Sequence, residues 1–305
     1  MTGRIRFGCQ FQAFRGRRDF LDTARRVEDL GFAVATFPDH FGGWASPWPS
    51  VVAAASVTST LRLGPMTINN DLWNPAVLAR DAASADQLSD GRVELGMGAG
   101  WRTADYAVAG VSEDPPRTRI ARLAESLAII RGYFRAADDG DRERLRPVQP
   151  TLPIFVGGGG RQILRLAATT ADIVGVHVNL GGNGVVIGGT GSDRLAEDDR
   201  GVLVDAIERR LGWIASDRPA SLPAPELHLY VLDVRRGPSR VAAAEATAAS
   251  YGISPTAVVE SPWFLTGPEE EMARKLVTIN ERYGVSYFTV GEEHADTLHT
   301  VMGHI

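Results

Sequence analysis

The chain has 305 residues, of which 44% are hydrophobic and 23% are charged, and its formal net charge at pH 7 is −5. This composition is typical of a globular protein, and no apolar run is long enough to predict a membrane-spanning helix. The negative charge gives no overall attraction for nucleic acid, so we expect neither a membrane nor a nucleic acid among its partners.

Strand-like and helix-like patterns alternate from the N-terminus onwards. Segment 5–11 is rich in β-forming residues, and segment 19–30 then repeats apolar residues at helical spacing before a glycine. A second strand is predicted at 32–37, and the loop DHFGGW separates it from a helix at 49–59. These segments predict two successive β/α units.

The next two units repeat this order. A strand at 61–68 precedes a helix that Asn74 caps with its side chain and Pro75 begins, at a position where no backbone N–H is needed. A fourth strand at 93–97 is followed by a long helix at 117–134.

The remaining four strands lie in the second half of the chain. We predict them, with their helices, at 152–156, 162–171, 173–178, 194–213, 227–234, 240–251, 268–282 and 285–290. The stretch LGGNGVVIGGTGS at 180–192 contains too much glycine for a stable element. We therefore predict an insertion or mobile lid over 178–225, between strands six and seven.

The strand pattern indicates the fold class. Short apolar strands without clean alternation, separated by helices, indicate a parallel sheet buried on both faces. Eight such units indicate a closed (β/α)8 TIM barrel, with an open doubly wound sheet as the alternative. We expect residues 1–305 to form one TIM-barrel domain.

Polar and aromatic residues follow five of the predicted strands, the first four and the sixth. In a barrel of this kind the active site lies at the C-terminal ends of the strands, so these residues are expected to share one rim. They are Gln10, Gln12, Asp39, His40, Trp44, Asn69, Asn70, Asp71, Trp73, Trp101, His177 and Asn179.

Two glycine-rich loops follow strands four and five. The first is GMGAG, and the second, VGGGGR, leads directly into a helix. Glycines let the backbone approach a ligand, and the N–H groups at a helix start bind anions, so we predict a phosphate site here. The alternative is a pair of flexible turns. Neither loop matches a dinucleotide fingerprint or a P-loop.

His40 is the candidate for proton transfer. An imidazole titrates near neutrality, and the adjacent carboxylate of Asp39 can tune it or can instead accept a hydrogen bond from a bound ring. The alternative is a capped turn with a surface pair. His294, His299 and His304 lack the spacing of metal ligands, so we predict no metal site.

The chain offers no obvious covalent nucleophile. Cys9, the only cysteine, permits no internal disulfide and is expected to be buried and inert on the first strand. Lys275 is the only lysine, and no Gly-x-Ser-x-Gly elbow occurs. We therefore expect a bound cofactor. The lone cysteine and the polar N-terminus, which lacks a secretory pattern, predict a cytoplasmic protein.

Taken together, the motifs resemble the bacterial luciferase-like monooxygenase superfamily. The segments are RFG, FPDHF, NPAVLARDAASADQLSDGRVELGMGAGW, PIFVGGGG, ADIVGV, LTGPEEEMARKL and YGVSYFTVG, and the similarity that they mark extends over nearly the whole chain. The resemblance implies a TIM barrel that binds a flavin or a 5-deazaflavin, with the phosphate at the loop after strand five, and often a homodimer. It also implies a non-prolyl cis peptide in the third strand, near Met66–Thr67 or one or two bonds later.

The short form Asp-His-Phe is similar to the branch that uses coenzyme F420, whereas FMN enzymes more often show Glu-His there. By this resemblance Asp39 and His40 flank the deazaflavin and Trp44 lines the substrate pocket. One position departs from a known activity of that branch. Where F420-dependent glucose-6-phosphate dehydrogenases place a catalytic glutamate, this chain has Trp101. With so little lysine to bind a sugar phosphate, we expect a bulkier, less charged substrate.

The sequence thus predicts an F420-dependent oxidoreductase that transfers a hydride between the deazaflavin and an organic substrate. The alternatives are an FMN-dependent monooxygenase that receives reduced flavin from a partner reductase, and a non-catalytic flavin-binding barrel. We assign catalysis to His40, the cofactor to Asp39, Met66, Thr67, Asn69, Gly98, Gly100, Gly158, Gly159 and Gly160, and the substrate pocket to Trp44, Trp73 and Trp101.

Overall fold

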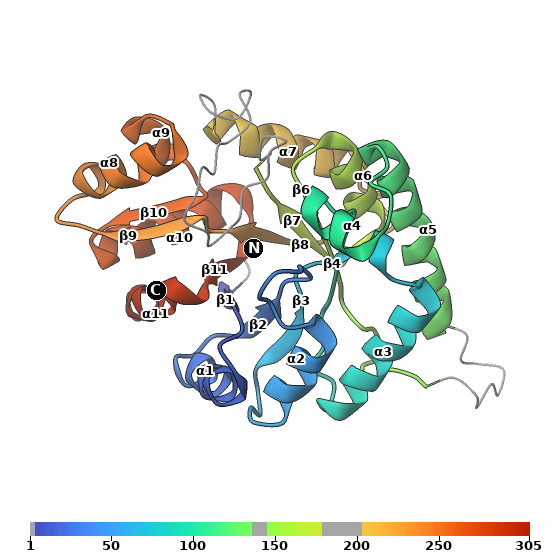
Figure 1. Ribbon diagram of the computed structural model, residues 1–305. Helices are drawn as coiled ribbons and strands as arrows, with labels where there is room; N and C mark the ends of the chain where they lie inside the picture. The colour runs from blue at the N-terminus through green and yellow to red at the C-terminus, as the bar shows by residue number, and fades with distance from the viewer. Residues whose placement is uncertain (1–3, 136–144, 179–202) are drawn as a thin grey trace.

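The computed structural model describes residues 4–135, 145–178 and 203–305 (Figure 1). The strands are β1 (Arg6–Gln10), β2 (Val34–Phe37), β3 (Arg62–Pro65), β4 (Ile68–Asn69), β5 (Leu95–Gly98), β6 (Ile154–Gly158), β7 (Ile173–Val176), β8 (Glu226–Tyr230), β9 (Asp233–Arg236), β10 (Phe264–Gly267) and β11 (Val285–Gly291). The helices are α1 (Arg17–Asp29), α2 (Pro47–Ala55), α3 (Pro75–Leu88), α4 (Thr103–Ala109), α5 (Pro116–Arg135), α6 (Arg161–Thr170), α7 (Leu203–Asp217), α8 (Arg240–Tyr251), α9 (Pro255–Glu260), α10 (Glu269–Tyr283) and α11 (Ala295–Met302), with short 3-10 turns at Asn70–Leu72 and Glu292–His294.

The main sheet closes into a barrel. Its strands are all parallel and follow the order β3-β2-β1-β11-β8-β7-β6-β5-β4. β3 and β4 are the two halves of the third predicted strand, separated by a cis peptide at Met66–Thr67, where the resemblance placed it. β4 pairs with β5, and Leu63 of β3 bridges Val93, so the ring is complete. The predicted TIM barrel is confirmed, and the open-sheet alternative is wrong.

One predicted strand is in fact two strands that belong to different sheets. The apolar run at 227–234 predicted one barrel strand, but the chain leaves the barrel after β8. Val231 donates its N–H to Thr289 of the barrel strand β11, whereas Leu232 donates to Trp263 before β10. The following strand β9 then pairs with β10 in a separate two-stranded parallel sheet. Continuous hydrophobicity could not reveal this change of partner, because the residues on both sides of it, such as Val231 and Val234, are buried.

The helices agree with the predicted pattern more closely than the strands. Asn74 caps α3 by accepting hydrogen bonds from the N–H groups of Ala76 and Val77, as its position before proline predicted. The short helices α4, α9 and α11 were not predicted, because six to eight residues are too few to show a clear helical period. The glycine-rich stretch 180–192 lies outside the described residues, and the rest of the predicted insertion contains α7.

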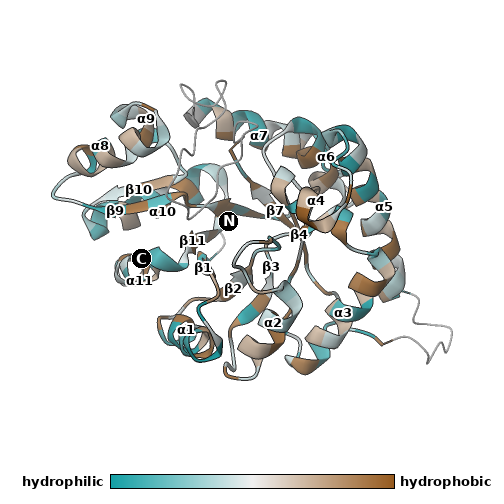
Figure 2. Cartoon of the chain, in the orientation of Figure 1, coloured by the Kyte–Doolittle hydropathy of each residue, from teal (hydrophilic) through white to brown (hydrophobic). Residues whose placement is uncertain are grey.

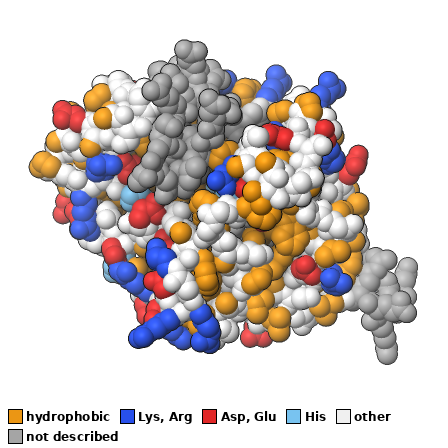
Figure 3. Space-filling model, viewed as in Figure 1, with side chains coloured by type: hydrophobic (Ala, Val, Ile, Leu, Met, Phe, Trp, Pro, Cys, Tyr) orange, Lys and Arg blue, Asp and Glu red, His pale blue; other side chains and the backbone are white. Residues whose placement is uncertain are grey.

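Helices surround the barrel, and hydrophobic residues concentrate on the strands and on the helix faces that pack against them (Figure 2). Cys9 of β1 is fully buried, and burial raises the pKa of its thiol well above the ordinary value, in agreement with an inert side chain. On the surface, hydrophobic side chains gather over and between α2, α3 and α4 (Figure 3). None of the helices within the described ranges is long and apolar enough to cross a membrane.

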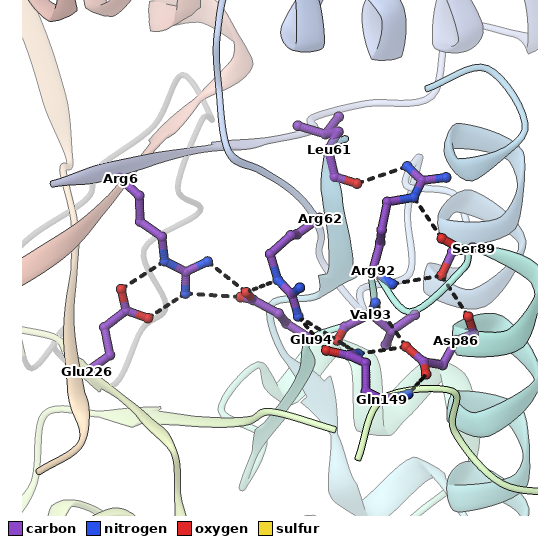
Figure 4. Close-up of polar contacts among 10 residues, drawn as sticks. All are labelled: Arg6, Leu61, Arg62, Asp86, Ser89, Arg92, Val93, Glu94, Gln149 and Glu226. Carbon is purple, nitrogen blue, oxygen red and sulfur yellow. Dashed lines mark hydrogen bonds and ion pairs between the residues drawn. The ribbon is translucent and has the colours of Figure 1, made fainter. Parts of the chain in front are cut away.

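Ion pairs close the N-terminal end of the barrel (Figure 4). The guanidinium of Arg6, at the start of β1, lies 2.6 Å from a carboxylate oxygen of Glu94 and 2.5 Å from one of Glu226. Arg62, at the start of β3, donates its Nε–H to the same Glu94 oxygen at 2.6 Å. The Arg6 guanidinium also lies 4.0 Å from the ring centre of Tyr287. These contacts therefore join residues that are far apart in the sequence at the N-terminal end of the barrel.

Candidate active site

A cavity of about 430 Å³ opens at the C-terminal ends of the barrel strands. Such a volume lies within the range of small-molecule sites. The predicted site residues that line it are His40, Asp39, Met66, Thr67, Asn69, Gly98, Gly100, Gly158, Gly160, Trp44 and Trp101. The structure therefore brings together predicted site residues that are up to 121 positions apart, from Asp39 to Gly160.

His40 contacts a carboxylate that the sequence did not single out. Its Nδ1 atom lies 2.7 Å from Oδ2 of Asp105, whose side chain is only 1% exposed. The other Asp105 oxygen accepts hydrogen bonds from the N–H of Phe41 at 3.1 Å and from the Arg102 guanidinium at 2.9 Å. A carboxylate oxygen accepts hydrogen bonds, so a neutral His40 imidazole that donates to Asp105 has its proton on Nδ1. The other ring nitrogen, Nε2, then carries no proton and can accept one at the cavity that His40 lines.

The carboxylate of Asp39 binds groups on the neighbouring strand end and does not hydrogen-bond to His40. Its Oδ2 atom accepts hydrogen bonds from the N–H of Asn69 at 3.0 Å and from the indole Nε1–H of Trp73 at 2.8 Å. Burial raises the pKa of Asp39 above its ordinary value, and these two hydrogen bonds oppose the shift. The expectation that Asp39 tunes His40 is corrected in one respect, since the carboxylate hydrogen-bonded to the imidazole is Asp105.

Two of the three predicted tryptophans enclose His40. The ring of Trp44 meets the imidazole with centroids 5.7 Å apart, and Trp101 meets it at 5.6 Å and 86°, both edge-on. Trp73 is not among the residues that line the cavity, because its indole points to Asp39. Gly159 does not line it either, and its carbonyl accepts a hydrogen bond from Arg210 at 2.9 Å.

The glycines of the two loops differ in what a side chain at their position would contact. A Cβ atom on Gly158 would lie 2.3 Å from Cγ2 of Ile163, and one on Gly100, whose φ is +72°, would lie 2.4 Å from Oδ1 of Asn69. These two glycines are therefore required by close packing. A Cβ atom on Gly160 would meet no described atom within 4 Å, so this position, before the free N–H groups of α6, is open to a ligand.

Arg119 is a second residue that the sequence did not single out. It lines the cavity with a side chain that is only 8% exposed. Its Nη1 atom donates to the Gly100 carbonyl at 2.6 Å and to the Tyr106 hydroxyl at 3.3 Å, while Glu113, its ion-pair partner, is 3.9 Å away. Its Nε–H is buried and has no hydrogen-bond partner among the described residues. The cavity wall thus contains a cation with one donor unused.

His177 also lines the cavity, as its position after strand six predicted. Burial, followed by the charge of Arg210, lowers its pKa to about 4. The imidazole is therefore neutral at pH 7 and can serve as a hydrogen-bonding group, but not as a cation. Asn179, predicted beside it, lies outside the described residues.

Sequence signals for Asp105 and Arg119 exist but are weak. Asp105 lies in the first turn of α4, four residues after Trp101, where an acid is expected for helix stability alone. Arg119 lies near the start of the long helix α5, where an arginine normally faces solvent. Both acquire a role only when the helices pack over the mouth of the barrel.

The described residues contain no group of three or more histidine, cysteine, aspartate or glutamate side chains that could hold a metal ion. Of the three C-terminal histidines, His294 lies 3.6 Å from a carboxylate oxygen of Asp233, and His299 contacts the carbonyl oxygen of Leu30 at 2.9 Å. Their observed contacts are therefore structural.

A sequence profile described as luciferase-like monooxygenase matches residues 6–182, which include the barrel from β1 to β7 and most of the cavity wall. The chain belongs to the luciferase-like monooxygenase family. Its resemblance to that family, inferred from the sequence motifs, is confirmed.

Curated relatives of this luciferase-like protein match over part of their length. It is 32% identical over 177 residues to the F420-dependent glucose-6-phosphate dehydrogenase of Amycolatopsis mediterranei, covering 52% of each chain. It is 33% identical over 171 residues to the enzyme of the same name from Kineococcus radiotolerans, covering 50% of each. The chain thus spans about half the length of the curated relatives it matches.

Solved structures match over nearly the whole chain. An F420-dependent secondary alcohol dehydrogenase, solved in complex with an F420-acetone adduct, has a TM-score of 0.70 at 17% identity and covers 99% of both chains. The monooxygenase RslO1 from Streptomyces bottropensis has a TM-score of 0.72 at 20% identity, over 99% of this chain and 98% of its own. At these identities the similarity shows a common fold.

Proposed function

We propose that the protein is an F420-dependent oxidoreductase that transfers a hydride between the deazaflavin and an organic substrate. The observation that most supports this function is the His40–Asp105 pair at the wall of the barrel cavity, 2.7 Å apart. The names of the curated relatives and of one solved structure of the same fold support the choice of F420.

The residues of the cavity fit a cofactor that bears a phosphate. Arg119 offers a buried Nε–H without a partner among the described residues, and Gly160 leaves open space at the start of α6. Guanidinium groups and the N–H groups of a helix start both bind phosphate oxygens. These residues would hold the anionic part of F420. When bound, the deazaflavin supplies a carbon centre, C5, that accepts or donates a hydride.

His40 would move the accompanying proton. Asp105 fixes the Nδ1–H tautomer and the ring orientation, and it stabilises the imidazolium when Nε2 takes up a proton. Trp44 and Trp101 would help to hold the imidazole ring in place through their edge-on contacts with it. Asp39 would remain a fixed acceptor that positions Trp73 and the backbone of Asn69.

The cavity wall supports a substrate that is bulkier and less charged than a sugar phosphate. Trp101 occupies the position where the related sugar dehydrogenases are expected to place a glutamate. Trp44, Trp263 and Leu232 add apolar surface to the same cavity. Lys275, the only lysine of the chain, is not among the residues that line it, so no ammonium group is available there for a sugar phosphate.

The second candidate is an FMN-dependent monooxygenase, because the family description names that activity and RslO1 shares the fold. The same open glycine and buried arginine suit the phosphate of FMN. Fluorescence-quenching titrations of the purified protein with F420 and with FMN separate the two proposals. We expect micromolar binding of F420 and none of FMN; the reverse supports the monooxygenase, and binding of neither contradicts both. Light scattering of the same sample tests the expected homodimer.

A further inference from the structure

A second cavity, of about 400 Å³, lies outside the barrel between α8 and α10. The residues that line it are Arg240, Glu271, Arg274, Lys275 and Thr278, none of which lines the candidate active site. Four of them recur on α10 at spacings of three or four residues, so they share one face of that helix. Arg240 begins α8 and faces them across the cavity.

The charge of this cavity is unbalanced. It is lined by three basic side chains and one carboxylate, and among the described residues no acidic group lies within 4 Å of the side-chain nitrogens of Arg240, Arg274 or Lys275. Elsewhere the exposed arginines of this region do find partners, as Arg236 does with Glu269 at 2.7 Å. The basic side chains of the cavity therefore differ from these arginines, because they have no acidic partner among the described residues.

Two of these cations are held in place by backbone carbonyls. Lys275 donates through Nζ to the carbonyl oxygens of Val259 at 2.9 Å and Phe264 at 2.8 Å. Arg240 donates to the same Val259 oxygen at 3.2 Å. Val259 lies in the last turn of α9, so this carbonyl has no acceptor role within that helix. The shared acceptor fixes two like charges side by side.

Donors remain after these hydrogen bonds are made. An ammonium group has three N–H donors, of which Lys275 uses two, and a guanidinium has five, of which Arg240 uses one. Burial and the charge of Arg240 lower the pKa of Lys275 to about 7. The free protein thus disfavours the ammonium, and a bound anion would relieve this cost.

We propose that the cavity formed by Arg240, Arg274, Lys275 and Thr278 binds a small oxyanion of the phosphate or polycarboxylate class. The guanidinium groups and the remaining ammonium donor point to an acceptor with several negative oxygens, and the Thr278 hydroxyl adds a neutral donor. Glu271 at the edge of the cavity disfavours a ligand with more charge than the cations offset. The site is separate from the proposed cofactor cavity and does not depend on it.

The test uses the full-length protein and follows Lys275 alone, because the chain has no other lysine. N-Hydroxysuccinimidyl acetate acylates neutral amines, and mass spectrometry of the peptides separates Lys275 from the N-terminal amine. Inorganic phosphate and citrate serve as probes, with sodium chloride at equal ionic strength as the control. At pH 7 about half of the Lys275 side chains are neutral, so an anion that favours the ammonium tenfold slows acylation about fivefold.

Protection by phosphate, by citrate or by both supports the proposal and identifies the class of ligand, provided that the N-terminal amine is unaffected. Equal rates with both probes and with chloride would overturn it. Lack of any acylation of Lys275 in the free protein, while the N-terminal amine reacts, would also overturn it, because the cavity would then be closed to small molecules.

A pair of variants separates the cavity from general charge effects. Arg274→Gln removes a cation of the cavity whose guanidinium makes no hydrogen bond to any described residue, so we expect the fold to be retained and the probe concentration for half protection to rise about tenfold. Arg282→Gln removes a charge from the same helix outside the cavity and is expected to keep the wild-type curve. If wild type and Arg274→Gln require the same probe concentration for half protection of Lys275, the proposed site is wrong.

Discussion

The imidazole of His40 and the carboxylate of Asp105 lie 2.7 Å apart, although 65 residues separate them in the chain. The carboxylate beside His40 in the sequence, Asp39, instead accepts hydrogen bonds from Asn69 and Trp73. The carboxylates of Asp105 and Asp39 thus bind different partners at this end of the barrel. Asp105 orients the His40 ring, and Asp39 fixes the strand end at Asn69.

Replacement of His40 tests the proposed chemistry directly. We expect His40→Ala to bind F420 within about threefold of wild type and to lose turnover by about 10²- to 10⁴-fold, the usual contribution of a positioned acid or base. Fluorescence titration and steady-state kinetics measure the two effects. His304→Ala, at the exposed C-terminus, is the control. Normal F420 binding with unchanged turnover would remove His40 from its role, whereas normal binding with no turnover in wild type favours a non-catalytic barrel.

Asp105→Asn keeps the shape of the side chain but removes its charge. Because an amide can donate to Nδ1, the imidazole can adopt the wrong tautomer, and we expect kcat to fall about 10²-fold or more. A structural role alone would lower stability without changing the pH profile, so the profile of kcat is the decisive measurement. Asp114→Asn, which removes a more exposed carboxylate paired with Arg122, is expected to leave the profile unchanged. The double variant with His40→Ala should lose no more activity than His40→Ala alone.

Two glycines of one loop should respond differently to a methyl group. Gly160→Ala adds a Cβ atom where no described atom lies within 4 Å, so we expect normal stability and weaker binding of the phosphate-bearing cofactor. Gly158→Ala forces a Cβ atom to within 2.3 Å of Ile163, so we expect the free energy of unfolding to fall by about 1–3 kcal/mol. Urea unfolding and cofactor titration distinguish the cases, and identical behaviour of the two variants would contradict the assignment.

The buried carboxylate of Asp39 gives a prediction about pH. Burial raises the pKa of Asp39 in the folded protein, so the folded state holds its proton more tightly than the unfolded state. Wild type should therefore lose stability relative to Asp39→Asn as pH rises from about 4 through the higher folded pKa, and the difference should then stay constant. Urea unfolding of both proteins across this range measures it. A difference that does not change with pH would show that the pKa of Asp39 is the same in both states.

Much of the barrel could be predicted from the sequence because its signals are local. Apolar strands, the Asn74 cap and the glycine-rich strand ends are each visible within a few residues, and the barrel fold then places the strand ends on one rim. Asp105 and Arg119 could not be predicted, because each depends on how a helix packs over the cavity. The change of sheet between Val231 and Leu232 was hidden for a similar reason, since both partners are distant in the chain.

The position of β1 between β2 and β11 has a consequence for biosynthesis. β1 can pair with β2 once residues 34–37 have been made, but its other edge has no partner until residues 285–291 have been made. At about 5–20 residues per second, this edge stays open for roughly 15 to 60 seconds. Arg6 of β1 forms its ion pair with Glu226 only after the barrel has closed. Until then its charge lies on the unpaired strand, and charged residues on an exposed strand edge discourage pairing between nascent chains.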